Sequence, residues 1–331
     1  MLFLNADDVR KALPMREAIE AMKGAFAALS KGRALVPHRT NLAIPRHAGT
    51  SLVMSSYVDG ESPTEEALAL KVVSLFEGNR LRGLARIQAA VLVLEPDTGR
   101  IAALLEGATL TAIRTAAASG AATDVLARPE SKTLAVLGAG VQARAHIEAV
   151  CAIRSIESVR VFGPSPDRVK SVVQDCAARQ DVRARFIAMA SVAEALNGAD
   201  IVCATTTSAT PVFAAGDIPA GVHINAVGSY KPEAAEVPPE TVVRSKVVVD
   251  SRDAAWVEAG DLIQPLRAGR IGRDHVHAEL GEIVLGLRPG RKNAQEITLF
   301  KSVGIAVQDA FAARVAVGNA RRLGLGQEIE W

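Results

Sequence analysis

The chain has 331 residues, enough for two packed domains with a substantial hydrophobic core. Hydrophobic residues make up 49% and charged residues 22%, a composition typical of globular proteins and unlike that of disordered or fibrous ones. With 38 basic and 36 acidic residues the net charge is +2, so the charge favours neither nucleic acid nor an anionic membrane as a partner.

The N-terminal segment carries acidic residues where a signal peptide needs a longer apolar stretch, and no run reaches the ~18 apolar residues of a membrane helix. The three cysteines, Cys151, Cys176 and Cys203, are odd in number and far apart, which suits neither disulfides nor a zinc site. We expect three buried, inert thiols in a cytoplasmic protein. The histidines lack acidic or cysteine partners at a convincing spacing, so no metal site is expected.

The first part of the chain predicts a mixture of helices and strands. The first thirty residues are expected to be helical, with one apolar stripe and an end at Gly32. The apolar, β-like segment 87–96 continues through the turn Asp97-Thr98-Gly99 into a returning strand, as in a hairpin. An alanine-rich helix is then predicted over 108–127. The β-like segments are 51–58, 67–76 and 87–96.

From residue 131 onward, short apolar strands alternate with helices. This alternation predicts an α/β domain of the Rossmann type, with a doubly wound parallel sheet and helices on both faces. The tail from Ser302 is expected to form one long amphipathic helix that returns to the first domain. We therefore predict an α+β domain of residues 1–120 plus 302–331 and a Rossmann domain of residues 121–301.

The strongest local motif is LGAGVQA at 137–143, between a predicted strand and a predicted helix. Gly138 allows a tight turn, Gly140 leaves room for a pyrophosphate, and Ala143 lets the helix pack closely on the sheet. The N-terminus of the helix offers free N–H groups to the phosphates. The motif predicts a dinucleotide site, and the alternative is a glycine-rich turn that binds no ligand.

The end of the second Rossmann strand bears on the choice of cofactor. NAD sites usually place an acid there, whereas this chain has Gly163, followed by Ser165 and Arg168. The missing acid removes repulsion against a 2′-phosphate, which Ser165 or Arg168 would contact. We therefore favour NADP(H), with NAD(H) possible. The alternative is that Asp167 and Arg168 begin a solvated helix.

Several separated segments resemble one known family, in the same order and over nearly the whole chain. They are PHRT (37–40), ALKVVS (69–74), TAIRTAAAS (111–119), LGAGVQA (137–143), INAVGSYKPE (224–233), GEIVLGLRPG (281–290) and EITLFKSVGIAVQD (296–309). Together they resemble the ornithine cyclodeaminase/μ-crystallin family. The resemblance implies a homodimer in which the first domains build a shared β-structure, substrate binding by that domain, and an active site between the domains near the nicotinamide.

The resemblance also assigns roles to individual residues. Arg39 matches the arginine that binds the substrate carboxylate, Lys71 the active-site lysine, and Arg114 the arginine beside both substrate and nicotinamide. Met54 and Val303 match positions that line the substrate site. The positions that match cofactor contacts, besides the glycines, are Val141, Gln142, Thr206, Val227, Gly228, Ser229, Tyr230 and Ser302.

The three cationic residues also make chemical sense without the family. Cations from three separate segments suit an α-carboxylate, which the planar fork of arginine binds in a bidentate manner. Lys71 lies in an apolar strand, where burial would lower its pKa and make it a plausible proton donor. The alternative for each residue taken alone is a snorkelling or ion-paired side chain.

One departure from the family pattern favours a particular branch. Cyclodeaminases place a catalytic Asp two residues after the glycine that corresponds to Gly228, and this chain has Tyr230 there. Tyrosine, with a pKa near ~10, is a poor substitute, although Tyr230 is also compatible with simple packing. The segment instead resembles the reductase branch, which predicts NAD(P)H-dependent reduction of a small cyclic imine carboxylate. A cyclodeaminase, an alanine-type dehydrogenase acting on an amino acid, and a non-catalytic nucleotide-binding protein stay open as alternatives.

Overall fold

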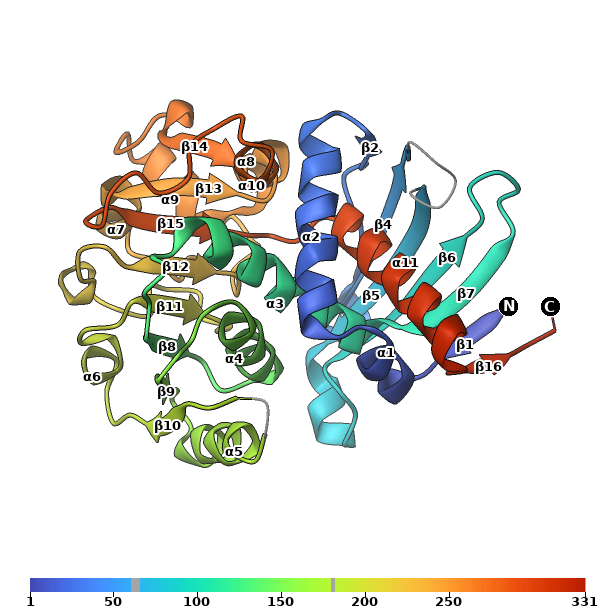
Figure 1. The fold of residues 1–331 in the computed structure, drawn as a ribbon, viewed down its shortest axis with the longest axis horizontal. Helices are drawn as coiled ribbons and strands as arrows, with labels where there is room; N and C mark the ends of the chain where they lie inside the picture. Colours follow the sequence, from blue (N-terminus) through green and yellow to red (C-terminus); the bar gives the residue numbers. More distant parts are fainter. Residues whose placement is uncertain (61–65, 180–181, 331) are drawn as a thin grey trace. The chain divides into compact units, whose positions relative to one another are not determined.

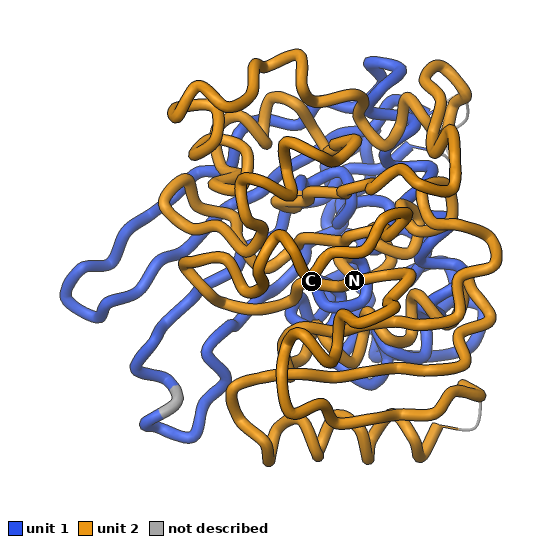
Figure 2. Tube along the Cα trace, turned by 90° about the vertical axis from the view of Figure 1, so that its left-hand side faces the viewer, with its two compact units in different colours: residues 1–114, 305–331 blue, residues 115–304 orange. Residues whose placement is uncertain are grey.

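The computed structural model describes residues 1–60, 66–179 and 182–330. The chain divides into two compact units, which Figure 2 colours separately. Unit 1 comprises Met1–Arg114 with Ile305–Trp331, and unit 2 comprises Thr115–Gly304. The sequence predicts divisions after residues 120 and 301, and the units divide after residues 114 and 304. The roles assigned to the two domains stay predictions.

Unit 1 is built on a mixed sheet in the order β16-β1-β7-β6-β5-β4-β2, with β3 also paired to β4. Helix α11 packs on β4, β5 and β6, and α2 packs on α11 (Figure 1). The elements are β1 (Leu2–Leu4), α1 (Ala6–Ala12), α2 (Met15–Ser30), β2 (Ala34–Leu35), β3 (Thr40–Ile44), η1 (Pro45–His47), β4 (Gly49–Val58), β5 (Ala67–Phe76), η2 (Glu77–Arg82), β6 (Ile87–Leu94), β7 (Ile101–Glu106), α3 (Gly107–Leu126, which continues into unit 2), α11 (Ala306–Leu323) and β16 (Gln327–Glu328).

The N-terminus differs from the helix that the sequence predicts. The chain begins with strand β1, which pairs in parallel with β7 and antiparallel with β16, so that the two ends of the chain lie side by side (Figure 1). The side chain of Asn5 then caps α1 by accepting from the N–H groups of Asp7 and Asp8. Three apolar residues are too few to show a period, and partners about a hundred and over three hundred residues away decide that they form a strand.

The C-terminal helix also begins later than the sequence predicts, at Ala306 and not at Ser302. One carboxylate oxygen of Asp250 accepts from the hydroxyl of Ser302 and from the N–H groups of Val303 and Gly304. Gly304 also has a positive φ of 79°. These contacts hold the segment before α11 in a non-helical conformation.

Unit 2 contains an eight-stranded parallel sheet in the order β10-β9-β8-β11-β12-β15-β13-β14, which confirms the predicted Rossmann-type architecture. Alternate residues of β8 enter two separate cores: Leu134 and Val136 pack with α4 and α5, whereas Ala135 and Leu137 join the core on the other face. The elements are β8 (Thr133–Leu137), α4 (Val141–Ile153), β9 (Ser158–Phe162), α5 (Pro166–Ala177), β10 (Arg185–Ala188), α6 (Val192–Leu196), β11 (Ile201–Ala204), η3 (Ala215–Asp217), β12 (His223–Ala226), α7 (Pro239–Arg244), β13 (Ser245–Val249), α8 (Arg252–Glu258), α9 (Gly260–Arg267), η4 (Arg273–His275), β14 (Val276–Glu279), α10 (Leu280–Val284) and β15 (Ile297–Lys301).

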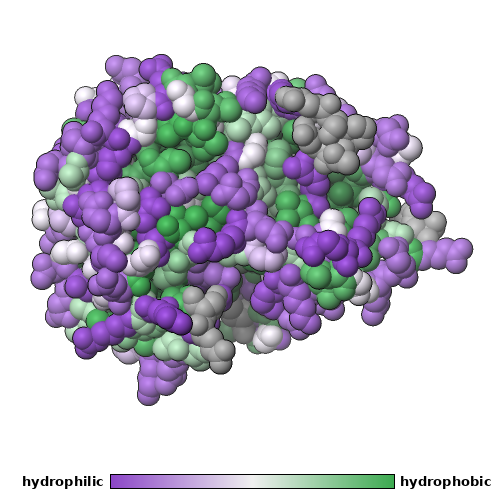
Figure 3. All heavy atoms as spheres, in the orientation of Figure 1, coloured by the Kyte–Doolittle hydropathy of each residue, from purple (hydrophilic) through white to green (hydrophobic). Residues whose placement is uncertain are grey.

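Hydrophilic residues cover much of the face shown in Figure 3, and apolar residues gather there in smaller groups. Within the described ranges, every helix is too short or too polar to cross a bilayer. The structure describes all three cysteines, and none of them forms a disulfide bond. Cys176 and Cys203 are buried as expected, but Cys151 is only half-buried.

Candidate active site

Lys71 lies on the inner face of the unit 1 sheet. Strand β5 alternates between buried and less buried residues, so Ala69, Lys71 and Val73 point to the same face. In the antiparallel register Lys71 lies opposite Met54 of β4 and Val91 of β6, and both of these are buried. The Lys71 side chain is only 1% exposed, so its ammonium group needs a partner within the protein.

That partner is Asp309 of α11. Its Oδ2 lies 2.7 Å from Lys71 Nζ, and its Oδ1 accepts a hydrogen bond of 3.0 Å from Arg114 Nε. Arg114 comes from α3 and is 5% exposed, and Asp309 is 2% exposed. One buried carboxylate therefore joins two of the predicted site residues.

Asp309 is not among the site residues that the sequence predicts. Its signal is an acid in the first turn of α11, within the run Ala306 to Ala313 in which every residue is buried. A carboxylate near a helix N-terminus is stabilised by the helix dipole, which explains its presence but does not reveal its partners. Only the packing of α11 on β5 brings Asp309 to Lys71.

The pKa of Lys71 is lowered from 10.5 to about 7, and burial is the largest cause. The positive charge of Arg114 contributes to this lowering, Asp309 opposes it, and Arg39 adds a smaller lowering effect. This is the direction that the sequence predicts. A lysine with a pKa near neutrality can release a proton and regain it under working conditions, which suits a general acid.

The buried cluster of Lys71, Arg114 and Asp309 carries one excess positive charge when the lysine is protonated. An uncompensated buried charge is unfavourable, so an anion is the ligand that this cluster fits. The half-buried Arg39 acts on the pKa of Lys71 and therefore lies within electrostatic range of the cluster. Unit 1 thus brings together four of the five predicted substrate contacts, with Met54 next to Lys71 in the register.

The fifth predicted substrate contact, Val303, belongs to unit 2. It is 7% exposed, and its N–H donates to Asp250. Its role at the substrate stays a prediction.

The glycine-rich loop of unit 2 has the features that a pyrophosphate needs. Gly138 has a φ of +114°, and a Cβ there would meet Thr205 O at 2.8 Å, so the turn itself requires glycine. A Cβ at Gly140 would meet nothing within 4 Å, so the protein's own packing does not explain that glycine. Helix α4 begins at Val141 without a side-chain cap, which leaves its N–H groups available to an anion. These observations fit a bound dinucleotide.

The other predicted cofactor residues follow the carboxyl ends of neighbouring strands, on both sides of the point between β8 and β11 where the strand order reverses. Ligands of doubly wound sheets bind at this switch point. Val141 is 70% exposed, and Gln142 is half-buried with an Oε1 that has no hydrogen-bond partner among the described residues. The strand ends are followed by Gly138 (β8), Gly163 (β9), Thr206 (β11), Val227, Gly228, Ser229 and Tyr230 (β12) and Ser302 (β15).

Three buried acids, none of them found by the sequence analysis, hold the hydroxyl side chains predicted to touch the cofactor. Thr206 donates to Glu236, Ser229 donates to Asp261, and Ser302 donates to Asp250. The available signal was a single acid next to apolar residues in each of these segments. Because each hydroxyl hydrogen is already used, these side chains would offer a cofactor only their remaining lone pairs.

The turn after β12 is organised around Glu236. Its carboxylate accepts from the N–H groups of Thr206, Gly228 and Ser229. A Cβ at Gly228 would lie 2.5 Å from Glu236 Oε1 and 2.1 Å from Thr206 O, so the protein's own packing requires glycine at this position. Val227 is half-buried, and Tyr230 packs against the core of unit 2, as the packing alternative for that tyrosine expects.

The segment after β9 presents the residues that bear on a 2′-phosphate. Ser165 is the N-cap of α5 and makes no side-chain cap hydrogen bond, and Arg168 in the first turn is exposed. A Cβ at Gly163 would approach Ala139 and Val169 at 3.3 Å, so a larger residue there would crowd the glycine-rich loop.

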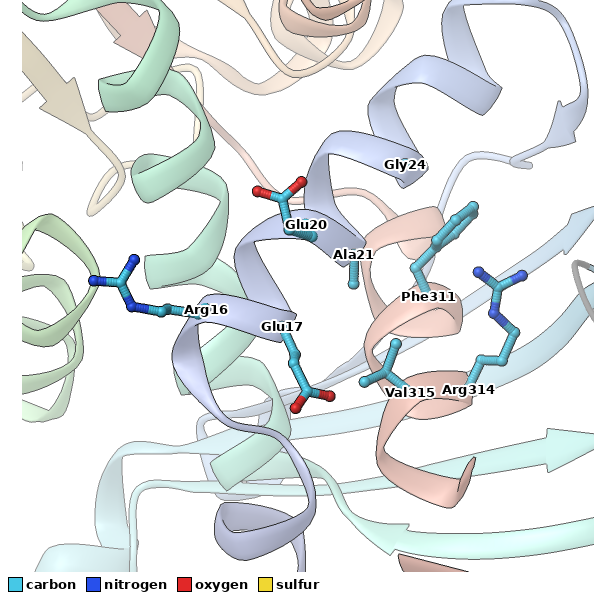
Figure 4. A pocket seen from close by; sticks show the side chains of 8 residues that line it. All are labelled: Arg16, Glu17, Glu20, Ala21, Gly24, Phe311, Arg314 and Val315. Atoms are coloured by element: carbon cyan, nitrogen blue, oxygen red, sulfur yellow. The ribbon is translucent and has the colours of Figure 1, made fainter. Parts of the chain in front are cut away.

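Among the described residues, no group of three or more His, Cys, Asp or Glu side chains is arranged to hold a metal ion. Figure 4 shows residues that line an open depression between α2 and α11, where Glu17 and Glu20 come from α2, and Phe311 and Arg314 come from α11. None of the predicted site residues lines it. The buried cluster on β5, α3 and α11 is therefore the better candidate for chemistry.

Comparisons with known proteins agree over nearly the whole chain. The model of the ornithine cyclodeaminase/mu-crystallin family matches residues 1–323. A Δ1-pyrroline-2-carboxylate reductase of Bacillus cereus is 40% identical over 332 residues, covering 100% of both chains. The ketimine reductase mu-crystallin of Rattus norvegicus is 35% identical over 317 residues, covering 95% of each.

Two solved structures are also similar to this chain over nearly its whole length. The Thermococcus litoralis Δ1-pyrroline-2-carboxylate reductase in complex with NADH and L-proline matches with a TM-score of 0.93 and 42% identity, covering 99% of this chain and 100% of that one. An archaeal alanine dehydrogenase dimer with bound NAD matches with a TM-score of 0.90 and 31% identity, covering 100% of this chain and 99% of that one.

Proposed function

The chain belongs to the ornithine cyclodeaminase/mu-crystallin family, and on that premise we propose that it is an NAD(P)H-dependent reductase of small cyclic imines that carry an α-carboxylate. Δ1-Pyrroline-2-carboxylate and Δ1-piperideine-2-carboxylate are the first candidate substrates, and the corresponding L-amino acids are the products. The observation that carries the proposal is the buried cluster of Lys71, Arg114 and Asp309, which has one excess positive charge and a lysine that titrates near neutrality.

In the proposed reaction Arg114 and Arg39 bind the substrate carboxylate, and Lys71 gives a proton to the imine nitrogen. The chemistry that a reduced nicotinamide supplies when bound is a hydride for the imine carbon. Proton and hydride together convert the C=N bond into a C–N single bond. The contact with Asp309 keeps Lys71 in place. Fixing the substrate carboxylate orients the imine carbon for hydride transfer.

We also propose that unit 2 binds the cofactor and prefers NADPH. Solved relatives are described with NADH or NAD, so the proposal rests on Gly163, Ser165 and Arg168 in this chain. Arg168→Ala should raise the KM for NADPH by about tenfold and leave the KM for NADH unchanged, as expected when one charge-assisted contact to phosphate is lost. Equal KM values for NADPH in the variant and the wild type would remove Arg168 from the phosphate site.

A homodimer formed by unit 1 is a further part of the proposal. The sheet face away from α11 exposes apolar side chains at Leu42, Val53 and Val72, which are 38–61% exposed. Two cross-strand pairs, Thr40 with Val53 and Val53 with Val72, make this surface continuous. The double variant Val53→Asp with Val72→Asp should convert a dimer into a monomer in light scattering, and a wild-type monomer would contradict the proposal.

The decisive experiment measures the loss of NADPH and NADH fluorescence with Δ1-pyrroline-2-carboxylate. In parallel, ornithine with NAD⁺ is tested for ammonia release, and pyruvate with ammonia is tested for NADH oxidation. Rapid cofactor oxidation with the cyclic imine alone supports the proposal. Ammonia release from ornithine without imine reduction would identify a cyclodeaminase, and activity with pyruvate alone an alanine-type dehydrogenase.

A further inference from the structure

Gln308 lies beside the buried cluster and is itself completely buried. It precedes Asp309 in the first turn of α11. Its Oε1 accepts from Arg114 Nη1 at 2.6 Å and from the N–H of Ile305 at 3.2 Å. The glutamine is therefore tied to the same arginine that Asp309 binds.

These two contacts fix the orientation of the amide. Both partners of Oε1 are donors, so exchanging the oxygen and nitrogen of the side chain would place N–H groups against N–H groups. The nitrogen must then point the other way. Gln308 Nε2 is buried and has no hydrogen-bond partner among the described residues. Buried donors are almost always satisfied, so an unsatisfied one calls for an acceptor from outside the chain.

We propose that Gln308 Nε2 donates a hydrogen bond to a carboxylate oxygen of the substrate and is a specificity-determining residue of the site. The amide is bonded to Arg114, so the guanidinium and Nε2 present N–H donors next to each other. Two adjacent donors match the two oxygens of one carboxylate. The cluster also lacks one negative charge, which the same carboxylate supplies.

This assignment rests on the proposed function and deepens it, because it names the part of the substrate that the enzyme recognises. A neutral imine of the same ring leaves both Nε2 and the excess positive charge unpaired. Gln308 therefore selects ring imines with a carboxylate against those without one. Loss of a buried charge-assisted hydrogen bond weakens binding by about ten- to a hundredfold.

The test is calorimetric binding of pyrrole-2-carboxylate, a planar and unreactive ring carboxylate, to the full chain saturated with NADPH. Two variants separate the possible roles of the side chain. Gln308→Glu keeps an oxygen for Arg114 and Ile305 but loses the N–H donor and adds a charge. Gln308→Met adds no charge but loses both donor and acceptor. Gln327→Glu on the exposed strand β16 is the matched control for one added charge in unit 1.

We expect both Gln308 variants to bind the analogue at least about tenfold more weakly than the wild type, with unchanged NADPH affinity and a cooperative thermal transition. Weaker binding by Gln308→Met alone would mean that Gln308 only orients Arg114, and weaker binding by Gln308→Glu alone would reflect the added charge. Either result overturns the proposal, as does a wild type that does not bind the analogue. Because binding requires no turnover, a wild type that binds the analogue but reduces no imine would refute the proposed function separately.

Discussion

Each unit contains a buried lysine–aspartate ion pair, and the two pairs look alike at first. Lys71 Nζ lies 2.7 Å from Asp309 in unit 1, and Lys301 Nζ lies 2.8 Å from Asp261 in unit 2. All four side chains are at most 2% exposed. Each lysine is on a β-strand. Distance and burial therefore do not distinguish the two pairs.

The hydrogen bonds around the pairs are different. Lys301 Nζ also donates to the carbonyl and the hydroxyl of Ser229, so all three ammonium hydrogens have acceptors. Asp261 accepts in addition from the N–H groups of Glu236 and Val237. In the part of the chain that the structure describes, Asp309 is the one acceptor in contact with Lys71 Nζ.

The pKa values follow the same division. The pKa of Lys71 is lowered to about 7, chiefly by burial and then by the charge of Arg114, and Asp309 opposes this only in part. Burial raises the pKa of Asp261, but the charge and hydrogen bond of Lys301 outweigh it, with help from Ser229, and the pKa is lowered overall. A fully satisfied pair keeps its charges and fixes the backbone, whereas a partly satisfied pair has capacity left for a ligand and for proton transfer.

The largest contrast is expected when each lysine is replaced by methionine. Lys71→Met should lower kcat by about 10²- to 10⁴-fold, the usual contribution of a general acid, with little loss of stability because Arg114 still neutralises Asp309. Lys301→Met leaves Asp261 without its cation and should cost about 3–5 kcal/mol of unfolding free energy. Steady-state kinetics and urea denaturation measure the two effects. A Lys71→Met enzyme with full activity would break the comparison.

Replacing the acid in unit 1 should shift a titration. Asp309 raises the pKa of Lys71, so Asp309→Asn lets that pKa fall below about 7. At pH 7 we expect kcat/KM to drop by about tenfold for each unit by which the pKa falls, and the pH profile to move to more acidic values. Asp261→Asn should instead lower the stability without moving the profile. An unshifted profile in Asp309→Asn would show that the two residues are not coupled.

The pH dependence of the wild type gives a smaller effect. If protonated Lys71 is the acid, kcat/KM should fall about tenfold per pH unit above about 7. Stability should change in the opposite sense, because between about 7 and 10.5 the unfolded state binds more protons at Lys71 than the folded state, so stability rises with pH in this window. Lys71→Met removes this site from both dependences, and identical profiles in the variant and the wild type would exclude Lys71 as their source.

The smallest expected effect concerns two glycines of unit 2, one beside open space and one packed against the protein. A Cβ at Gly140 meets no protein atom within 4 Å, so Gly140→Ala should leave the melting temperature unchanged and raise the KM for the cofactor about fivefold, as for one weakened hydrogen bond. Gly228→Ala collides with Glu236 and should lower the melting temperature. If Gly140→Ala also melted early with an unaltered KM, its open space would not belong to a ligand.

Much of the fold follows from local patterns. The apolar segment 67–76, predicted to be β-like, corresponds to β5, and the alternation of strands and helices after residue 131 corresponds to the parallel sheet. Strand β1 and the late start of α11 do not follow from local patterns, because distant partners decide them. A pattern reports which face a residue occupies but not what lies opposite that face.

The candidate site also has some features that follow from the nearby sequence and others that only the tertiary structure decides. By itself, the sequence determined the glycine-rich loop after β8 and the position of Lys71 in a buried strand, because both depend on the nearest few residues. Only the tertiary structure joined Lys71 to Asp309, 238 positions further along the chain, and left Gln308 with an unused donor beside them. In the tertiary structure the hydroxyl groups of Thr206, Ser229 and Ser302 also donate hydrogen bonds to buried acids. A buried charge must be neutralised by whatever group folding brings to it, and the residues near it in sequence do not identify that group.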